Sequence, residues 1–213
     1  MRLLIATRND GKVRELRRLL ASLPLEPVGL VDAGVVLDVE ETGATFEANA
    51  ETKARAFAEA SGLPALADDS GLVVDALGGR PGVHSARFAG VPRSDARNLA
   101  RLLEELREVP EGRRQARFVC VAALALPAAA PAWSGWSAGE VRLFRGVCEG
   151  RIGFVPRGTD GFGYDPVFLP VGHERTFGEL PAELKDGLSH RGIALRALAR
   201  ALARTLGTNP PGP

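Results

Sequence analysis

One stretch near the start of the chain decides its fold class: Leu3-Leu4-Ile5-Ala6-Thr7-Arg8-Asn9-Asp10-Gly11-Lys12. Its first four residues are apolar and predict a short buried strand. Leucines then recur at helical spacing with charged residues on the other side, and Asn9 or Asp10 is a natural N-cap for the helix that they predict. We therefore expect the chain to open with a strand, a turn and a helix.

Outward from this stretch, strand and helix patterns alternate along the rest of the chain. Ala65-Leu66-Ala67 predicts a buried strand, which we expect to end at Asp68 and to resume at Leu72. Interleaved strands and helices favour the α/β class. The other expected elements are strands over 27–30, 117–126 and 140–148, helices over 45–60 and 94–108, a glycine-rich loop over 158–166 and a last helix capped by Ser189.

Length and composition limit the architecture further. The chain has 213 residues, of which 45% are hydrophobic and 25% charged, the usual balance of a globular protein with a real core. This balance excludes a disordered chain, a collagen and a coiled-coil rod, and the length fits one domain, with or without a small second lobe. We expect residues 127–139 to form a loop or insertion and residues 208–213 to be a disordered tail.

Charge and cysteine content indicate a cytoplasmic protein that binds neither nucleic acid nor membrane. Lys and Arg number 27 against 26 Asp and Glu, so a net charge of +1 offers no global positive field to a nucleic-acid backbone. We find no signal peptide, and no apolar run approaches the roughly 20 residues of a membrane helix. Because two cysteines are too few for a disulfide framework, we expect Cys120 and Cys148 to be reduced and buried.

Lysine is rare in this chain. Only three of the basic residues are lysines, namely Lys12, Lys53 and Lys185, and the other 24 are arginines. Where lysine is so rare, each one is a candidate for a site at which a planar guanidinium cannot replace a compact ammonium. The alternative is chance placement on the surface.

The first turn has the outline of a phosphate-binding site. The predicted strand delivers the backbone to a helix N-terminus, where unpaired amides and the helix dipole favour an anion. Thr7 and Asn9 can add hydrogen bonds, and Lys12 can add a point charge. The turn is neither a Walker A loop nor a dinucleotide fingerprint, and an ordinary capped turn with a solvated lysine is the alternative.

Two pairs of acids suggest a metal site. Burying the carboxylates of Asp68 and Asp69 at the edge of a strand costs free energy unless a cation or hydrogen-bond donors compensate for it. Because neighbouring side chains of a strand point to opposite sides, we expect the two acids to have separate roles. Glu40-Glu41 adds two acids in a turn. Mg²⁺ binds one or two carboxylates together with substrate phosphates, so one Glu and one Asp would suffice. Ordinary turn carboxylates in solvent are the alternative.

The second half of the chain offers groups that suit a planar base. In Phe162-Gly163-Tyr164-Asp165 an aromatic ring between glycines can stack on a planar ligand, unless it folds onto the core instead. Lys185 and Ser189-His190-Arg191 place donors at the start of the last helix, although His190 alone is more often a capping residue. Phosphate donors, acids for Mg²⁺ and an aromatic ring together match a nucleoside triphosphate.

These motifs occur in a fixed order over nearly the whole chain and resemble the inosine/xanthosine triphosphate pyrophosphatase (HAM1-like) family. The resemblance implies a long twisted mixed β-sheet flanked by helices, two lobes with a central cleft, a single domain over residues 1–207 and a homodimer. It also implies Mg²⁺-dependent hydrolysis of ITP, dITP and XTP to the monophosphate and pyrophosphate. Beyond the stretches quoted above, the resemblance is carried by Glu40-Glu41-Thr42-Gly43, Thr45-Phe46, Asn49-Ala50, Lys53-Ala54, Ala67 to Leu72, Gly78-Gly79, Pro81-Gly82, Ser85-Ala86-Arg87, Gly161 to Pro166 and Ser189 to Gly192.

The resemblance also implies a role for each matched residue. Asp69 is the general base and, with Glu40, a metal ligand. Whether Glu41 and Asp68 also bind metal stays open. The residues implied to bind substrate are Thr7, Arg8, Asn9, Asp10, Gly11, Lys12, Lys53, Ser70, Phe162, Gly163, Tyr164, Asp165, Lys185, His190 and Arg191.

On this interpretation Asp69 deprotonates a water aimed at the α-phosphorus, while Mg²⁺ and the lysines neutralise the departing pyrophosphate. Hypoxanthine and xanthine carry an O6 acceptor that Arg191 or Lys185 could meet, whereas adenine presents a donor there. We therefore expect ITP and XTP to be cleaved far faster than ATP or GTP. The alternatives are a related pyrophosphatase for modified pyrimidine nucleotides, a general phosphohydrolase, and a nucleotide-sensing module that does not catalyse.

Overall fold

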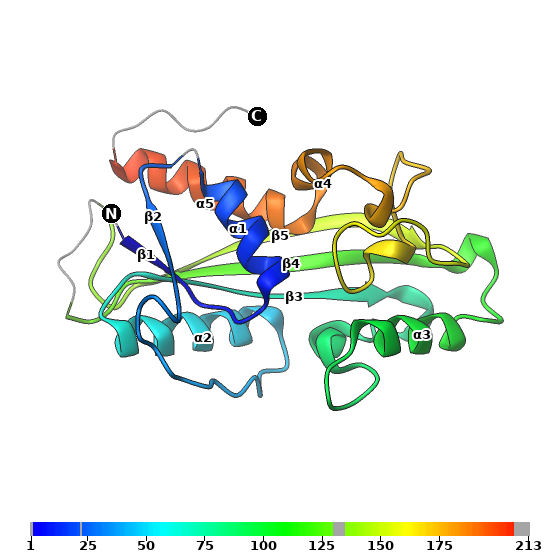
Figure 1. The fold of residues 1–213 in the computed structure, drawn as a ribbon, viewed down its shortest axis with the longest axis horizontal. Coiled ribbons are helices and arrows are strands. Elements are labelled where there is room, and N and C mark those ends of the chain that lie inside the picture. The colour runs from blue at the N-terminus through cyan, green and yellow to red at the C-terminus, as the bar shows by residue number, and fades with distance from the viewer. Residues whose placement is uncertain (1, 22, 130–134, 207–213) are drawn as a thin grey trace. The chain divides into compact units, whose positions relative to one another are not determined.

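The structure, a computed structural model, describes residues 2–21, 23–129 and 135–206 and contains a mixed six-stranded β-sheet with flanking helices (Figure 1). The strand order is β2-β1-β3-β4-β5-β6. Strand β1 pairs in parallel with β2 and β3, and β5 pairs antiparallel with β6. The α/β class and the mixed sheet are therefore confirmed. The tail predicted over residues 208–213 and part of the expected insertion at 127–139 lie outside the described residues.

The chain divides into two compact units. Unit 1 comprises Met1–Asp69, Val121–Arg145 and Ile193–Pro213, and unit 2 comprises Ser70–Cys120 and Gly146–Gly192. Strands β3 (Ala65–Val74), β4 (Gln115–Ala125) and β5 (Val141–Ile152) each contribute residues to both units. The boundary in β3 falls between Asp69 and Ser70, two residues that the sequence places in one motif.

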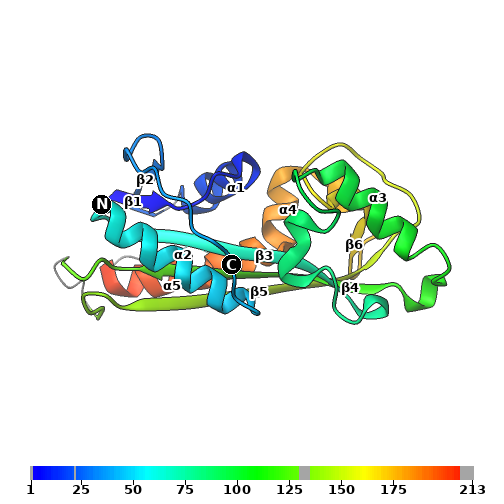
Figure 2. The same ribbon diagram turned by 90° about the horizontal axis from the view of Figure 1, so that it is seen from below.

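Unit 1 contains β1 (Arg2–Ile5), α1 (Asp10–Leu20), β2 (Glu26–Gly29), α2 (Phe46–Ser61) and most of α5 (His190–Leu206). Helix α2 lies on one face of its strands, and α1 and α5 lie on the other (Figures 1 and 2). The buried face of α2 packs on small and aliphatic strand residues. Its core cluster consists of Leu4, Ala6, Leu30, Ala50, Ala54, Phe57, Ala58, Ala65, Ala67, Val121, Ala123 and Ala125.

Unit 2 contains α3 (Asp95–Glu105), β6 (Phe168–Pro170), α4 (Ala182–Leu188) and the short 3-10 segments Asp75–Leu77, Gly82–Arg87, Glu111–Arg113, Asp165–Val167 and Phe177–Glu179. Figure 1 shows α3 and α4 on opposite sides of the strands of this unit. Its core is aromatic: the ring of Phe118 lies 4.6 Å from that of Phe168, which lies 5.1 Å from that of Phe177. Such ring pairs add packing energy beyond the area that they bury.

A buried arginine also holds unit 2 together. Arg114 is 1% exposed, and its guanidinium donates hydrogen bonds to the carbonyls of Leu106, Val109, Ile152 and Gly153 at 2.7 to 3.1 Å. Burial lowers the pKa of Arg114. Because its donors are matched by carbonyls, this side chain ties the end of α3 to the end of β5.

The main correction to the expected elements concerns β3. The sequence predicts that the strand stops at Asp68, but β3 runs without a break from Ala65 to Val74, so Asp68 and Asp69 lie within the sheet. The prediction was wrong because lysines compensate both carboxylates, so the strand need not end there. The structure also contains β6 and α4, which the sequence did not predict.

Both cysteines are buried, as expected. Within the part of the chain that the structure describes, no helix combines the length and the apolar character that a membrane span requires.

Candidate functional site

The turn that opens α1 is capped as the sequence predicts. Asn9 is the N-cap, and its Oδ1 accepts a hydrogen bond from the backbone N–H of Lys12 at 3.0 Å. Thr7 Oγ1 accepts in turn from the backbone N–H of Asn9. Arg8 is turned to a neighbouring loop, where it bonds to the Leu37 carbonyl and pairs with the exposed Asp38. Asn9 and Asp10 are exposed, so the start of the helix is open to a ligand.

Lys12 and Asp68 form a nearly buried ion pair in unit 1. The ammonium of Lys12 lies 2.9 Å from Asp68 Oδ2, and the two side chains are 15% and 1% exposed. The lysine comes from the first turn of α1 and the aspartate from β3. This pair fixes the first helix to the strand that carries the second acid.

Lys53 lies among three acids in unit 1. Its Nζ donates to Glu41 Oε1 at 2.7 Å and to the backbone carbonyl of Asp68 at 2.8 Å, and it lies 3.4 Å from Asp69 Oδ1. Burial alone would lower the pKa of Lys53, but the charges of Asp69, Asp68 and Glu41 outweigh it and raise that pKa. Lys53 is therefore a fixed cation.

Asp69 is held from two sides. Its Oδ2 accepts a hydrogen bond from Asn49 Nδ2 at 3.1 Å, while its Oδ1 faces Lys53. Burial raises the pKa of Asp69 above its ordinary value, although Lys53, Lys12 and the Asn49 hydrogen bond each pull it down. A carboxylate with a raised pKa is a stronger base, which suits a residue that accepts a proton.

The two adjacent acids divide their contacts, as strand alternation predicts. The Asp68 carboxylate pairs with Lys12 of α1, and the Asp69 carboxylate contacts Asn49 and Lys53 of α2. These helices lie on opposite faces of the strands of unit 1 (Figures 1 and 2). The division follows from the period of two along a strand.

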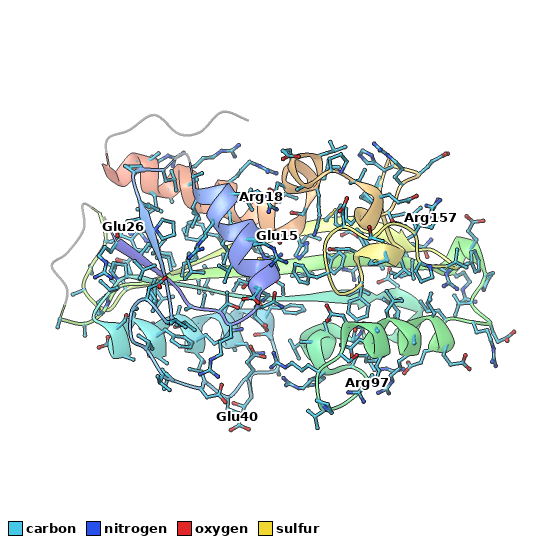
Figure 3. All side chains as sticks on the ribbon, in the orientation of Figure 1. Glu15, Arg18, Glu26, Glu40, Arg97 and Arg157 are labelled. Carbon is cyan, nitrogen blue, oxygen red and sulfur yellow. The ribbon has the colours of Figure 1, made fainter. Side chains whose placement is uncertain are left out.

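Glu40 and Glu41 of the acidic turn lie in different surroundings. Glu40 is exposed, and Figure 3 shows its side chain pointing away from the ribbon. Glu41 is half-buried and shares Lys53 with Asp69. The structure thus brings Glu41, and not Glu40, to the cluster of acids and lysines.

The donor set of unit 1 fits a hard cation held by few protein ligands. Among the described residues, no group of three or more His, Cys, Asp and Glu side chains is arranged to hold a metal ion. Mg²⁺ needs no such group, because it keeps several waters and binds one or two carboxylates plus substrate phosphates. Glu41 and Asp69, both directed at the ammonium of Lys53, are carboxylates of this kind.

The glycine-rich loop of unit 2 is closed by the Asp165 side chain. Asp165 Oδ2 accepts from the backbone N–H of Phe162 at 2.8 Å and from Lys185 Nζ at 2.7 Å. A Cβ at Gly161, whose φ is +77°, would collide with the same oxygen, so the loop requires glycine there. From outside, Asp95 Oδ2 accepts from the backbone N–H of Gly163.

Tyr164 lies in the core of unit 2. It is buried, and its hydroxyl donates to the backbone carbonyl of Ser85 at 2.9 Å. Burial raises the pKa of Tyr164. In this structure its side chain anchors the loop.

Two cationic side chains lie beside the ring of Phe162 within unit 2. Lys185 Nζ lies 5.3 Å from the centre of this ring, and the Arg191 guanidinium lies 5.8 Å from it. Arg191 Nη2 also donates to Ser70 Oγ at 3.3 Å. His190 stacks on another ring, Phe118, at 4.7 Å. Cations beside an aromatic face are attracted by it, so Lys185 and Arg191 are held next to this ring.

Sequence reasoning did not include Asn49 or Asp95 among the site residues, and it left the role of Glu41 open. A signal existed for Asn49, since it is four residues from Lys53 and so shares a helix face with it. No local signal existed for Asp95, because its contact with Gly163 joins residues that are 68 apart in the chain.

An α/β fold with paired carboxylates and lysines beside an open helix N-terminus is typical of enzymes that act on phosphates. The model of the Ham1 family matches residues 3–201, so the chain belongs to this family. Proteins of this family are nucleotide pyrophosphatases and generally depend on a metal ion.

Curated relatives and solved structures agree with this assignment. The chain is 54% identical to a dITP/XTP pyrophosphatase of Symbiobacterium thermophilum, over 95% of this chain and 94% of the relative. It is 48% identical to a dITP/XTP pyrophosphatase of Streptomyces coelicolor, over 97% and 99%. A HAM1 protein structure from Coxiella burnetii matches with a TM-score of 0.83 and 41% identity, over 96% of this chain and 99% of that one.

Proposed function

We propose that this chain hydrolyses ITP, dITP and XTP to the nucleoside monophosphate and pyrophosphate, and so removes non-standard purine nucleotides from the nucleotide pool. The observation that carries the proposal is the buried Asp69 carboxylate, held between Asn49 and Lys53, in a chain whose relatives are named dITP/XTP pyrophosphatases. Because burial raises its pKa, Asp69 is suited to accept a proton from an attacking water.

Unit 1 supplies the groups for the triphosphate. The backbone amides and side chains from Thr7 to Lys12 bind phosphate oxygens at the start of α1, and Lys53 adds a second ammonium. Both lysines already face carboxylates, so they are positioned before a nucleotide arrives. Their charge offsets the negative charge that develops on the departing pyrophosphate.

Magnesium is the metal that we assign to this site. Glu41 and Asp69 are the ligands that we favour, because both face Lys53, and Glu40 is the alternative implied by the family resemblance. When bound, Mg²⁺ supplies positive charge to the phosphates and orients the leaving group. The fold of unit 1 holds both carboxylates next to Lys53, whose pKa their negative charges raise.

Unit 2 supplies the groups for the base. Phe162 offers a stacking surface, and Lys185 and Arg191 offer donors to the O6 atom of hypoxanthine or xanthine. Adenine presents a donor at this position, which would leave a buried donor of the protein unpaired. Ser70, Gly163, Asp165 and His190 complete the base-binding half, with Tyr164 anchoring the loop.

The cellular setting follows from the same assignment. We place the enzyme in the cytoplasm, as a homodimer that acts on free nucleotides and not on nucleic acid. We also propose that residues 1–207 form one domain, since β3 runs without a break from unit 1 into unit 2 between Asp69 and Ser70.

The product formed from each nucleotide tests this proposal. The purified chain is incubated with ITP, dITP, XTP, ATP, GTP and modified pyrimidine triphosphates, with Mg²⁺ or with a chelator, and phosphorus NMR identifies the products. We expect pyrophosphate and monophosphate from ITP, dITP and XTP, only with Mg²⁺. Release of single phosphate would indicate a general phosphohydrolase, equal rates on all purine triphosphates would remove the base selectivity, and no turnover would indicate a sensing module.

A further inference from the structure

Asn49 connects the acidic turn of unit 1 to Asp69. It is 2% exposed and lies on α2, the fourth residue after the N-cap Thr45. Its Oδ1 accepts from the backbone N–H of Gly43 at 2.8 Å, and its Nδ2 donates to Asp69 Oδ2 at 3.1 Å. The Gly43 N–H can only donate, so it fixes the amide with its NH₂ group toward the carboxylate.

Unit 2 contains the same device with a different partner. Asn98 is also 2% exposed and is the fourth residue after the N-cap Ser94 of α3. Its Oδ1 accepts from the backbone N–H of Ala89 at 2.7 Å, and its Nδ2 donates to the backbone carbonyl of Ala86 at 3.0 Å. Asn98 therefore bonds only to backbone on both sides, which is what a purely structural asparagine does.

The difference between the two asparagines lies in the last hydrogen bond. At α3 the NH₂ group ends on a backbone carbonyl, and at α2 it ends on a carboxylate. We infer that Asn49 is a positioning residue that holds Asp69 by Oδ2, so that Oδ1 stays directed at the Lys53 side of the cluster. This inference rests on the proposed function, in which Asp69 acts on the attacking water.

A substitution at Gly43 perturbs the side-chain amide of Asn49 without changing Asn49 itself. A Cβ added at this position would lie 2.6 Å from Asn49 Oδ1 and 2.9 Å from Ala48 Cβ, both too close for real contacts. Gly43→Ala therefore displaces the amide while Asn49 itself remains. If Asn49 orients Asp69, crowding the amide from this side must disturb the carboxylate as well.

Asn49→Asp is the variant that separates the two hydrogen bonds of Asn49. An aspartate there can still accept from the Gly43 N–H, but it replaces the NH₂ group that faces Asp69 with a second carboxyl group, and two carboxylates at this distance repel each other. Asn98→Asp is the matched control, since it keeps an acceptor for Ala89 and loses the donor to Ala86.

The experiment measures melting temperature, kcat and KM for dITP with Mg²⁺ in the wild type, N49D, G43A and N98D. We expect N49D to lower kcat by about 100-fold with KM changed less than about threefold, and G43A to lower kcat by a smaller factor. N98D should lower the melting temperature and leave kcat within about twofold. N49D and G43A with wild-type kcat would overturn the inference, as would kcat losses that follow melting temperature equally in N49D and N98D.

A second readout does not depend on turnover. The side-chain amide NMR signal of Asn49, identified by its loss in N49D, should shift on Asp69→Asn substitution, whereas that of Asn98 should not move. An unmoved Asn49 signal would contradict the positioning role even in a fully active enzyme. A wild type that does not cleave dITP would contradict the proposed function, while this NMR comparison would still decide whether Asn49 holds Asp69.

Discussion

Each unit of this molecule contains a buried ion pair between a lysine and an aspartate, and the surroundings of the two pairs differ. In unit 1 Lys12 and Asp68 are 2.9 Å apart, and in unit 2 Lys185 and Asp165 are 2.7 Å apart. The first pair is next in the chain to a second acid, Asp69, which faces another lysine. The second pair lies among aromatic rings, with Lys185 5.3 Å from the centre of Phe162.

This difference shows how one kind of contact serves two kinds of recognition. Several carboxylates and ammonium groups close together suit a divalent cation and a polyphosphate. The carboxylates can pair with the cation, and the ammonium groups can pair with the phosphates. A single ammonium beside a planar ring suits a flat base with one acceptor. In our proposal phosphate chemistry belongs to unit 1 and base selection to unit 2, and each of the following variants tests one side of this division.

The largest effect is expected in unit 1. Asp69→Asn removes the proton acceptor, so kcat for dITP should fall by about 10²- to 10⁴-fold while KM changes little. Pyrophosphate release under saturating Mg²⁺ measures both constants. A variant that keeps near-normal turnover would remove Asp69 from the role of general base.

In unit 2, Lys185→Met leaves the buried Asp165 carboxylate without its 2.7 Å ammonium partner. Breaking such a pair costs about 3–5 kcal/mol, so the free energy of unfolding measured in urea should fall by about this amount. The double variant K185M/D165N should recover most of the stability, because the amide that replaces the Asp165 carboxylate carries no charge. Because it lacks the Lys185 donor, the double variant should discriminate poorly between dITP and dATP. Full discrimination in the double variant would show that unit 2 does not select the base through Lys185.

A smaller effect is expected from the stacking surface. Phe162→Leu keeps an apolar side chain but removes the ring, and base–aromatic stacking is worth about 1–3 kcal/mol. The KM for dITP should rise by about 5- to 160-fold with kcat nearly unchanged. A KM within twofold of the wild type would show that the ring serves the core of unit 2 and not the base.

The smallest effect concerns the stability of the metal-free protein. Because folding raises the pKa of Asp69, the native state binds this proton more tightly than the unfolded chain, and stability falls as pH rises above the ordinary value of 3.8. Asp69→Asn removes this loss. Its melting temperature in a chelator should therefore equal or exceed that of the wild type at pH 8, and the gap should close near pH 4. A variant that melts lower at pH 8 would show that ionised Asp69 stabilises the fold.

Much of the fold could be predicted because its elements depend on residues that are close together in the sequence. The strand and capped helix from Leu3 onward, the helix that begins after Thr45 and the α/β alternation depend on periodicity and caps within a few residues. The strand break predicted at Asp68 was wrong because a buried carboxylate is unfavourable in a strand when its partner is not considered. That partner, Lys12, comes from a helix that is far from Asp68 in the sequence.

The candidate site shows the same limit. Rare lysines and paired acids mark Lys53 and Asp69 in the sequence, but the choice between Glu40 and Glu41 depends on which side chain the turn directs inward. Arg114 is a further case, since its four carbonyl partners lie on segments that only the fold brings together. Such contacts have no periodicity along the chain.

The proposed division of base binding and phosphate binding between the units is tested most directly with two ligands that each represent one end of the substrate. Backbone amide NMR spectra of the protein are recorded with inosine alone and with inorganic pyrophosphate plus Mg²⁺. We predict that inosine shifts the signals of Gly163 and its neighbours in unit 2, and that pyrophosphate with Mg²⁺ shifts those of Gly11 and Lys12 in unit 1. Inosine shifts centred on Gly11 and Lys12, or pyrophosphate shifts centred on Gly163, would contradict it.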